Sequence, residues 1–174
     1  MKYALTYGLL SGLVIIATML VGITMTGQDN FFSSELFGYL VMLVALTFIF
    51  VGVKRYRDVE RGGVIKFVPA LLMGLSIAAV AGLAYVVVWE IYLAATDYKF
   101  MDEYIAGILR AREAEGASAA AIAKEAAGLE AMRVSYGNPL FRVPMTFLEI
   151  FPVGLLVALV SAALLRNPRV MPAR

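Results

Sequence analysis

The sequence predicts an all-α integral membrane protein, built as a four-helix bundle with a small helical cap in the outer loop between helices three and four. Composition is the first observation, because 61% of the 174 residues are hydrophobic and 16% are charged. A soluble domain is roughly half apolar and about a quarter charged. The second observation is that the apolar residues gather in long blocks, which is typical of membrane spans.

Four apolar blocks define the expected spans of one transmembrane domain over residues 1–174. A helix needs about 20 apolar residues to cross a bilayer. The blocks that qualify cover residues 3–26, 36–53, 67–92 and 144–165. The first block is longer than the apolar core of a cleavable signal peptide, so we expect it to remain as a span.

Basic residues in the short loops predict the orientation of these spans. The loop after the second span carries the cations Lys54, Arg55, Arg57, Arg61 and Lys66. The loop after the first span carries none, and the C-terminal tail carries three arginines. Since cytoplasmic loops hold the excess of lysine and arginine, we expect both termini in the cytoplasm. The same cations either serve topology alone or also contact anionic lipid headgroups.

The long loop over residues 95–143 is then expected outside, folded as two short helices. Its apolar residues follow helical spacing on both sides of Gly116, and Ser118 fits the N-cap of the second helix. The apolar stripes are narrow. We therefore expect a cap that rests on the bundle or on a partner, and not an independent soluble domain.

Two missing residue types narrow the chemistry. The chain has no Cys and no His, which excludes disulfides, thiol nucleophiles, imidazole catalysis and His-ligated metals. The net charge of +2 and the lack of a glycine-rich phosphate loop argue against a nucleic-acid partner. We expect no catalytic residue, no cofactor and no metal site.

Glu149 is the most informative polar residue, because it lies inside the apolar block of the fourth span. It follows Pro144 by five residues, so it lies roughly 7 Å below the outer edge. Pro152 has no N–H to offer Leu148 and is expected to break or loosen the helix there. Two interpretations remain open, an internal ion pair with Arg142 and a functional carboxylate.

Glu90, next to Trp89 at the outer end of the third span, completes the candidate membrane polar site. It either reaches headgroup water or faces Glu149, in which case two close carboxylates would share a proton or bind a cation. The first two spans also echo the last two, either by duplication or by chance. That alignment matches Glu90 with Gln28 and Glu149 with Glu35, which adds two candidates to the site.

Small residues at four-residue spacing predict close helix packing, either inside the bundle or at an oligomer seam. The glycines concerned are Gly8, Gly12, Gly74, Gly82 and Gly154.

Several motifs resemble a known family of membrane proteins. They are GVKRYRD at 52–58 with Gly62-Gly63, Tyr85 with WEIY at 89–92, YGNP at 136–139 and TFLEIFPVG at 146–154. Together they resemble the bacterial membrane family catalogued as domain of unknown function 4199. The resemblance implies a four-helix protein of the bacterial inner (plasma) membrane. It supplies no activity, cofactor or catalytic residue.

Three functional hypotheses fit the sequence. The first is a non-enzymatic membrane subunit or scaffold that acts through helix packing and its outer helical loop, with a homo-oligomer or another membrane protein as partner. The second is a small homo-oligomeric transporter or channel that uses membrane carboxylates to bind protons or cations. The third, an intramembrane enzyme acting on lipid or envelope precursors, lacks any recognisable nucleophile.

Overall fold

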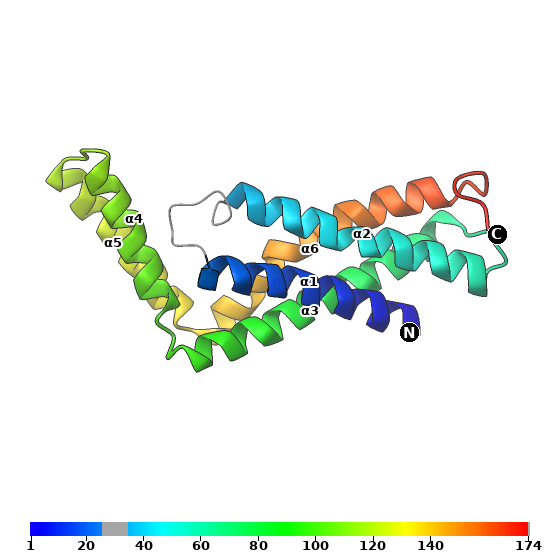
Figure 1. Ribbon diagram of the computed structural model, residues 1–174, viewed down its shortest axis with the longest axis horizontal. Coiled ribbons are helices and arrows are strands. Elements are labelled where there is room, and N and C mark those ends of the chain that lie inside the picture. The colour runs from blue at the N-terminus through cyan, green and yellow to red at the C-terminus, as the bar shows by residue number, and fades with distance from the viewer. Residues whose placement is uncertain (26–34, 174) are drawn as a thin grey trace. The chain divides into compact units, whose positions relative to one another are not determined.

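The computed structural model describes residues 1–25 and 35–173, which form six helices and no strand (Figure 1). The helices are α1 (Lys2–Met25), α2 (Glu35–Glu60), α3 (Phe67–Ala95), α4 (Phe100–Ala114), α5 (Ala119–Tyr136) and α6 (Pro139–Leu165). Four of them, α1, α2, α3 and α6, are long and apolar enough to cross a membrane. The predictions of an all-α chain and of four such helices are confirmed for the described residues.

The chain divides into two compact units. The first unit comprises Met1–Val88 and Phe147–Arg174, and the second comprises Trp89–Thr146. The first therefore contains α1, α2 and most of α3 and α6. The second contains the end of α3, the helices α4 and α5, and the beginning of α6.

The first unit is held together by small residues that let α3 and α6 approach closely. A Cβ atom on Gly74 would lie 2.8 Å from the Cβ of Ala158, and one on Gly154 would lie 2.8 Å from the Cβ of Ala78. Residues four apart on α3 thus meet residues four apart on α6 in antiparallel order. Ile49 of α2 is fully buried beside both glycines. No larger side chain fits at these two glycines without a shift of the backbones.

The other predicted packing glycines also contact helices of the same chain. A Cβ on Gly12 would lie 2.9 Å from the Cβ of Ala84, and Gly8 approaches α3 as closely, so α1 packs tightly on α3. Gly82 leaves room for the ring of Phe147. The small residues therefore face the interior of the first unit and are not free to line an oligomer seam.

Helix α2 extends beyond its expected end, which corrects the loop expected after the second span. It continues to Glu60, so Lys54 and Arg57 lie on the helix. The extra turns are stabilised by a pair at i and i+4 between Lys54 and Asp58. The helix stops where Gly62 and the following glycine adopt φ of 60° and 85°, a conformation that other residues rarely tolerate.

Helix α6 also differs from its expected limits. It begins at Pro139, earlier than expected, because the Asn138 side chain accepts a 3.0 Å hydrogen bond from the backbone N–H of Leu140. Arg142 consequently lies on this helix. Pro152 does not interrupt α6, which continues to Leu165, and a local loosening of the helix at this proline stays a prediction.

The second unit contains the α4–α5 hairpin. Ser118 caps α5, as predicted, by accepting a 3.3 Å hydrogen bond from the N–H of Ala121. An ion pair of 3.1 Å between Arg112 and Glu125 links the two helices. The guanidinium of Arg133 holds the pKa of the Glu130 carboxyl below its usual range. Whether this hairpin serves as a cap on the membrane helices stays a prediction.

Candidate membrane polar site

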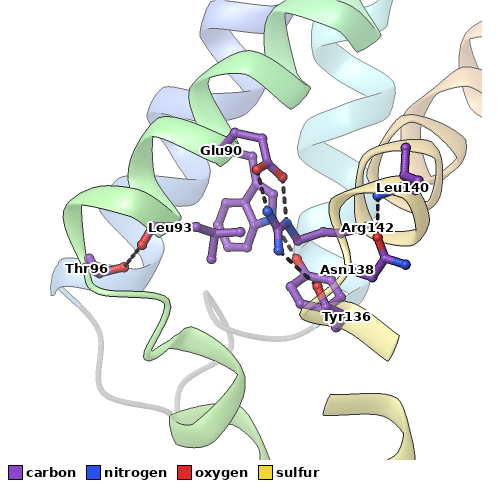
Figure 2. Close-up of polar contacts among 8 residues, drawn as sticks. Glu90, Leu93, Thr96, Tyr136, Asn138, Leu140 and Arg142 are labelled. Carbon is purple, nitrogen blue, oxygen red and sulfur yellow. Dashed lines mark hydrogen bonds and ion pairs between the residues drawn. The ribbon is translucent and has the colours of Figure 1, made fainter. Parts of the chain in front are cut away.

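A two-pronged ion pair joins Glu90 of α3 to Arg142 of α6 in the second unit (Figure 2). Nε of Arg142 donates to Oε1 of Glu90 at 2.7 Å, and Nη2 donates to Oε2 at 2.6 Å. The Arg142 side chain is 3% exposed and that of Glu90 is 26% exposed. Such paired, charge-assisted bonds are the strongest polar contacts that side chains make.

Aromatic residues hold the Arg142 guanidinium in place. Its Nη1 donates to the backbone carbonyl of Tyr136 at 3.0 Å, on the opposite side from Glu90 (Figure 2). The rings of Tyr98 and Tyr136 have their centres 5.2 and 5.7 Å from the guanidinium carbon. Cations are attracted to ring faces at this range. Tyr98 is in the left-handed conformation, with φ of 57°, and its N–H bonds to the carbonyl of Leu93 at 2.8 Å.

Trp89 extends this cluster from α3. Its side chain is buried, and its Nε1 donates to the hydroxyl of Tyr136 at 2.7 Å. The indole stacks on Tyr92 and meets Phe100 edge to face, with ring centres 5.2 and 4.8 Å apart. The second unit therefore joins α3, α4, α5 and α6 through one aromatic and ionic cluster.

The ion pair corrects one interpretation of the sequence. Arg142 is paired with Glu90 and not with Glu149. The Glu90 carboxylate accepts two hydrogen bonds from a permanently charged group, so it is poorly suited to carry or release a proton. The chemistry of this arrangement is that of a clamp between two helix ends.

The small-residue register contains a signal for this pair that the sequence analysis missed. Ala78 of α3 is matched with Gly154 of α6. Twelve residues on from Ala78 is Glu90, and twelve residues back from Gly154 is Arg142. Extending the antiparallel register of the glycines would therefore have pointed to Glu90 and Arg142 as partners.

Glu149 belongs to the first unit and presents a different situation. Its side chain is exposed on α6, and among the described residues it forms neither a hydrogen bond nor an ion pair. Exposed apolar residues surround it at helical spacing, namely Leu148, Pro152, Leu156 and Val160. Glu149 is thus a lone carboxylate on an apolar face of a helix that is long enough to cross a membrane.

The two candidates suggested by the apparent repeat add little. Gln28 lies outside the described residues, and Glu35 is the first residue of α2. Within the part of the chain that the structure covers, no three acidic side chains gather in a way that could hold a metal ion.

Arg57 is wrongly placed among the headgroup-contacting cations, because its side chain is 0% exposed. Its Nε donates to Oδ1 of Asp58 at 2.7 Å. Its two terminal nitrogens donate to the backbone carbonyls of Val170 and Met171 in the C-terminal tail. The desolvation of a guanidinium is tolerable here because all three of its nitrogens are hydrogen-bonded. Arg57 therefore fastens the tail to α2.

The remaining cations of this region are more accessible. Arg55, Arg61 and Lys66 are exposed, and Arg61 bonds to the hydroxyl of Tyr56 at 2.7 Å. The nearby Glu60 is already paired with Lys2 at 2.7 Å. The three exposed cations therefore leave an excess of positive charge beside α2 and α3.

A family model described as "Protein of unknown function (DUF4199)" matches residues 2–167. The chain belongs to this family. No curated protein and no solved structure matches it.

The family match and the four apolar helices together describe a membrane protein of unknown activity. The resemblance seen in the motifs is confirmed, since the family match covers all of them. The match includes Glu90, Arg142 and Glu149. The family description assigns no role to any of these residues.

Proposed function

We propose that this family member is a non-enzymatic membrane subunit or scaffold that acts through helix packing, with the α4–α5 hairpin as a second contact region. The observation that supports the proposal is the exposed carboxylate of Glu149, which has no partner among the described residues and lies among apolar residues of α6. Ionisable groups in membrane spans nearly always face protein or water, because hydrocarbon solvates them poorly.

The position of Glu149 along α6 makes exposure to lipid costly. Sixteen residues separate it from Leu165, the last residue of the helix, which corresponds to roughly 24 Å at the helical rise. The hydrocarbon core is about 30 Å thick. A glutamate has only two methylene groups, so its carboxylate extends a short way toward the headgroups. A protein partner that covers this face would remove the cost.

The state of Glu90 supports a non-enzymatic role. An acid–base pair of two membrane carboxylates would need Glu90 free to exchange protons. Its carboxylate is instead held by Arg142 through two hydrogen bonds of 2.6 and 2.7 Å. That arrangement favours a structural use of the polar cluster.

The proposed setting is the bacterial inner membrane, with both termini in the cytoplasm. The exposed cations Arg55, Arg61 and Lys66 support this orientation, because lysine and arginine accumulate on the cytoplasmic side. These three side chains also suit the phosphate groups of anionic lipids. Arg57 does not take part, since it binds the C-terminal tail.

Native mass spectrometry tests the proposal directly. The protein is extracted from its own membrane in a gentle amphiphile, and the mass of the intact assembly is measured. We expect a stoichiometric assembly. It should dissociate in the double variant Glu149→Leu with Leu156→Trp, because the bulky tryptophan prevents the partner from packing on α6. A monomer that carries only lipid would overturn the proposal.

A small homo-oligomeric transporter or channel is the second candidate, and Glu149 favours it as well. A carboxylate on an apolar face could bind a proton or cation at the seam between copies. This candidate predicts a pH-dependent flux in proteoliposomes that Glu149→Gln abolishes and Glu115→Gln leaves unchanged. Vesicles that stay tight to protons and monovalent cations would contradict it.

A further inference from the structure

The lone carboxylate on α6 indicates what kind of partner would fit it. We propose that the partner is a different membrane protein whose transmembrane helix places a lysine or arginine against Glu149. The proposal rests on the subunit function and adds the chemistry of recognition. The docking surface consists of Glu149 with Leu148, Pro152, Leu156 and Val160, and is called the Glu149 face below.

The shape of the Glu149 face suits a helix. Leu148, Pro152, Leu156 and Val160 follow one another at four-residue intervals, and Glu149 precedes Pro152 by three residues, so all five line one side of α6. The small residues of α6 point elsewhere, since Gly154 and Ala158 pack against α3 of the same chain. The face is therefore composed of larger apolar side chains with one charged group, and a partner helix would pack across it with a single polar contact.

Charge complementarity selects a cation on the partner. A carboxylate removed from water is stabilised by a positive charge and its hydrogen bonds, and an apolar partner would leave it buried and unpaired. The described spans carry basic residues at Lys2, which begins α1, and at Lys54–Arg57, near the end of α2. Elsewhere in these spans the only basic residue is Arg142. Arg142 is already engaged by Glu90.

A second copy of the chain is therefore a poor occupant of the Glu149 face. It would bring a second Glu149 and, away from the Lys2 and Lys54–Arg57 ends of its described spans, no free cation. Two carboxylates that approach within a few ångströms repel unless they share a proton. A foreign helix that carries lysine or arginine neutralises the charge without this requirement.

Photo-crosslinking in the native membrane tests the proposal, with a benzophenone side chain introduced at Leu148. The matched control carries the same probe at Leu83 of α3, which is 58% exposed where Leu148 is 57% exposed. The contact of Ala78 with Gly154 places these two leucines at similar heights along their helices. We expect the probe at 148 to capture one membrane protein, and the control to capture lipid.

Sequencing of the crosslinked peptide decides the chemistry. The expected peptide lies in an apolar segment and contains a lysine or arginine within about one helical turn of the crosslink. A peptide without a basic residue, or a peptide of this same chain, would overturn this inference and leave the subunit function standing. Capture of lipid alone, together with a monomer in native mass spectrometry, would sink both proposals.

A charge exchange closes the test. Glu149→Gln should lower the crosslinking yield about tenfold, and Glu149→Lys should abolish it. Changing the partner's cation to glutamate should restore the crosslinking yield of the Glu149→Lys variant and should not restore that of the native protein or of Glu149→Gln. Thermal unfolding of the purified Glu149 variants in detergent should stay at or above the native temperature, since the residue has no partner within its own described chain. A lower unfolding temperature, or no rescue, would contradict the proposal.

Discussion

Glu90 and Arg142 are joined by two parallel hydrogen bonds, from Nε to Oε1 at 2.7 Å and from Nη2 to Oε2 at 2.6 Å. The pair connects the C-terminal part of α3 with the first turns of α6. Helices α4 and α5 lie between these two residues in sequence. The pair therefore joins the first and last segments of the second unit.

Breaking this pair should destabilise the second unit. Glu90→Gln leaves the buried Arg142 guanidinium without a counter-charge. Removing one partner of a fully buried pair costs about 3–5 kcal/mol, and the partial exposure of Glu90 reduces this to about 1–3 kcal/mol. Hydrogen exchange in detergent should show faster exchange over α4 and α5. Glu113→Gln, at an exposed carboxylate of α4, is the control, and equal exchange in both variants would contradict the expectation.

Arg142→Lys should recover only part of the stability of the native pair. A lysine keeps the charge, but it cannot make two parallel bonds to Glu90 while also donating to the Tyr136 carbonyl in the same plane. The unfolding temperature should fall between those of the native protein and Arg142→Met. Full recovery by lysine would mean that charge alone, without the planar geometry, holds the cluster together.

The single tryptophan reports on the aromatic cluster. Tyr136→Phe removes the acceptor of the Trp89 indole N–H, and leaving that buried donor unpaired costs about 1–3 kcal/mol. We expect a shifted fluorescence emission and a lower unfolding temperature. Tyr39→Phe serves as control, because Tyr39 is exposed on α2. Identical spectra for the two variants would count against the Trp89–Tyr136 hydrogen bond.

The reciprocal packing of α3 and α6 predicts a rescue. Gly74→Ala places a methyl group 2.8 Å from the Cβ of Ala158 and should destabilise the first unit by about 1–3 kcal/mol. Adding Ala158→Gly removes the opposing methyl and should restore most of the loss. Gly38→Ala, where nothing lies within 4 Å, should be neutral or slightly stabilising. Thermal unfolding in detergent measures all three, and additive losses in the double variant would contradict the packing.

The hydrogen bonds between Arg57 and the C-terminal tail predict a change in protease sensitivity. Arg57→Met removes the donors to the Val170 and Met171 carbonyls, so the tail should detach from α2. Trypsin should then cleave after Arg169 several times faster in the detergent-solubilised protein. Arg55→Met, which removes an exposed arginine on the same helix, should leave the rate unchanged. Equal rates in both variants would show that Arg57 does not restrain the tail.

The sequence was enough to predict the helices because their cause is local. Long apolar blocks such as the one in α3 satisfy backbone hydrogen bonds within one helix, and the cap at Ser118 depends on a hydroxyl next to its own helix. The limits of α2 and α6 could not be predicted from the length of the apolar blocks. The end of α2 depends on the ion pair between Lys54 and Asp58, and the start of α6 depends on the capping amide of Asn138.

The candidate site was only partly accessible from the sequence. Glu90, Arg142 and Glu149 stand out because a charge near or inside an apolar block is rare. Their pairing could not be assigned, since either carboxylate could accept the guanidinium of Arg142. The burial of Arg57 could not be predicted either. Nothing in a basic segment indicates which arginine will bind backbone carbonyls far away in the sequence.

By itself the sequence determined the membrane character, the four apolar helices, the absence of thiol and imidazole chemistry, and the family. These features follow from composition and from contacts between near neighbours in the chain. Only the tertiary structure decided that Arg142 binds Glu90, that Arg57 binds the tail and that Glu149 is left without a partner in the described chain. Such pairings join residues far apart in sequence, and they depend on which helix faces meet once the backbones are packed.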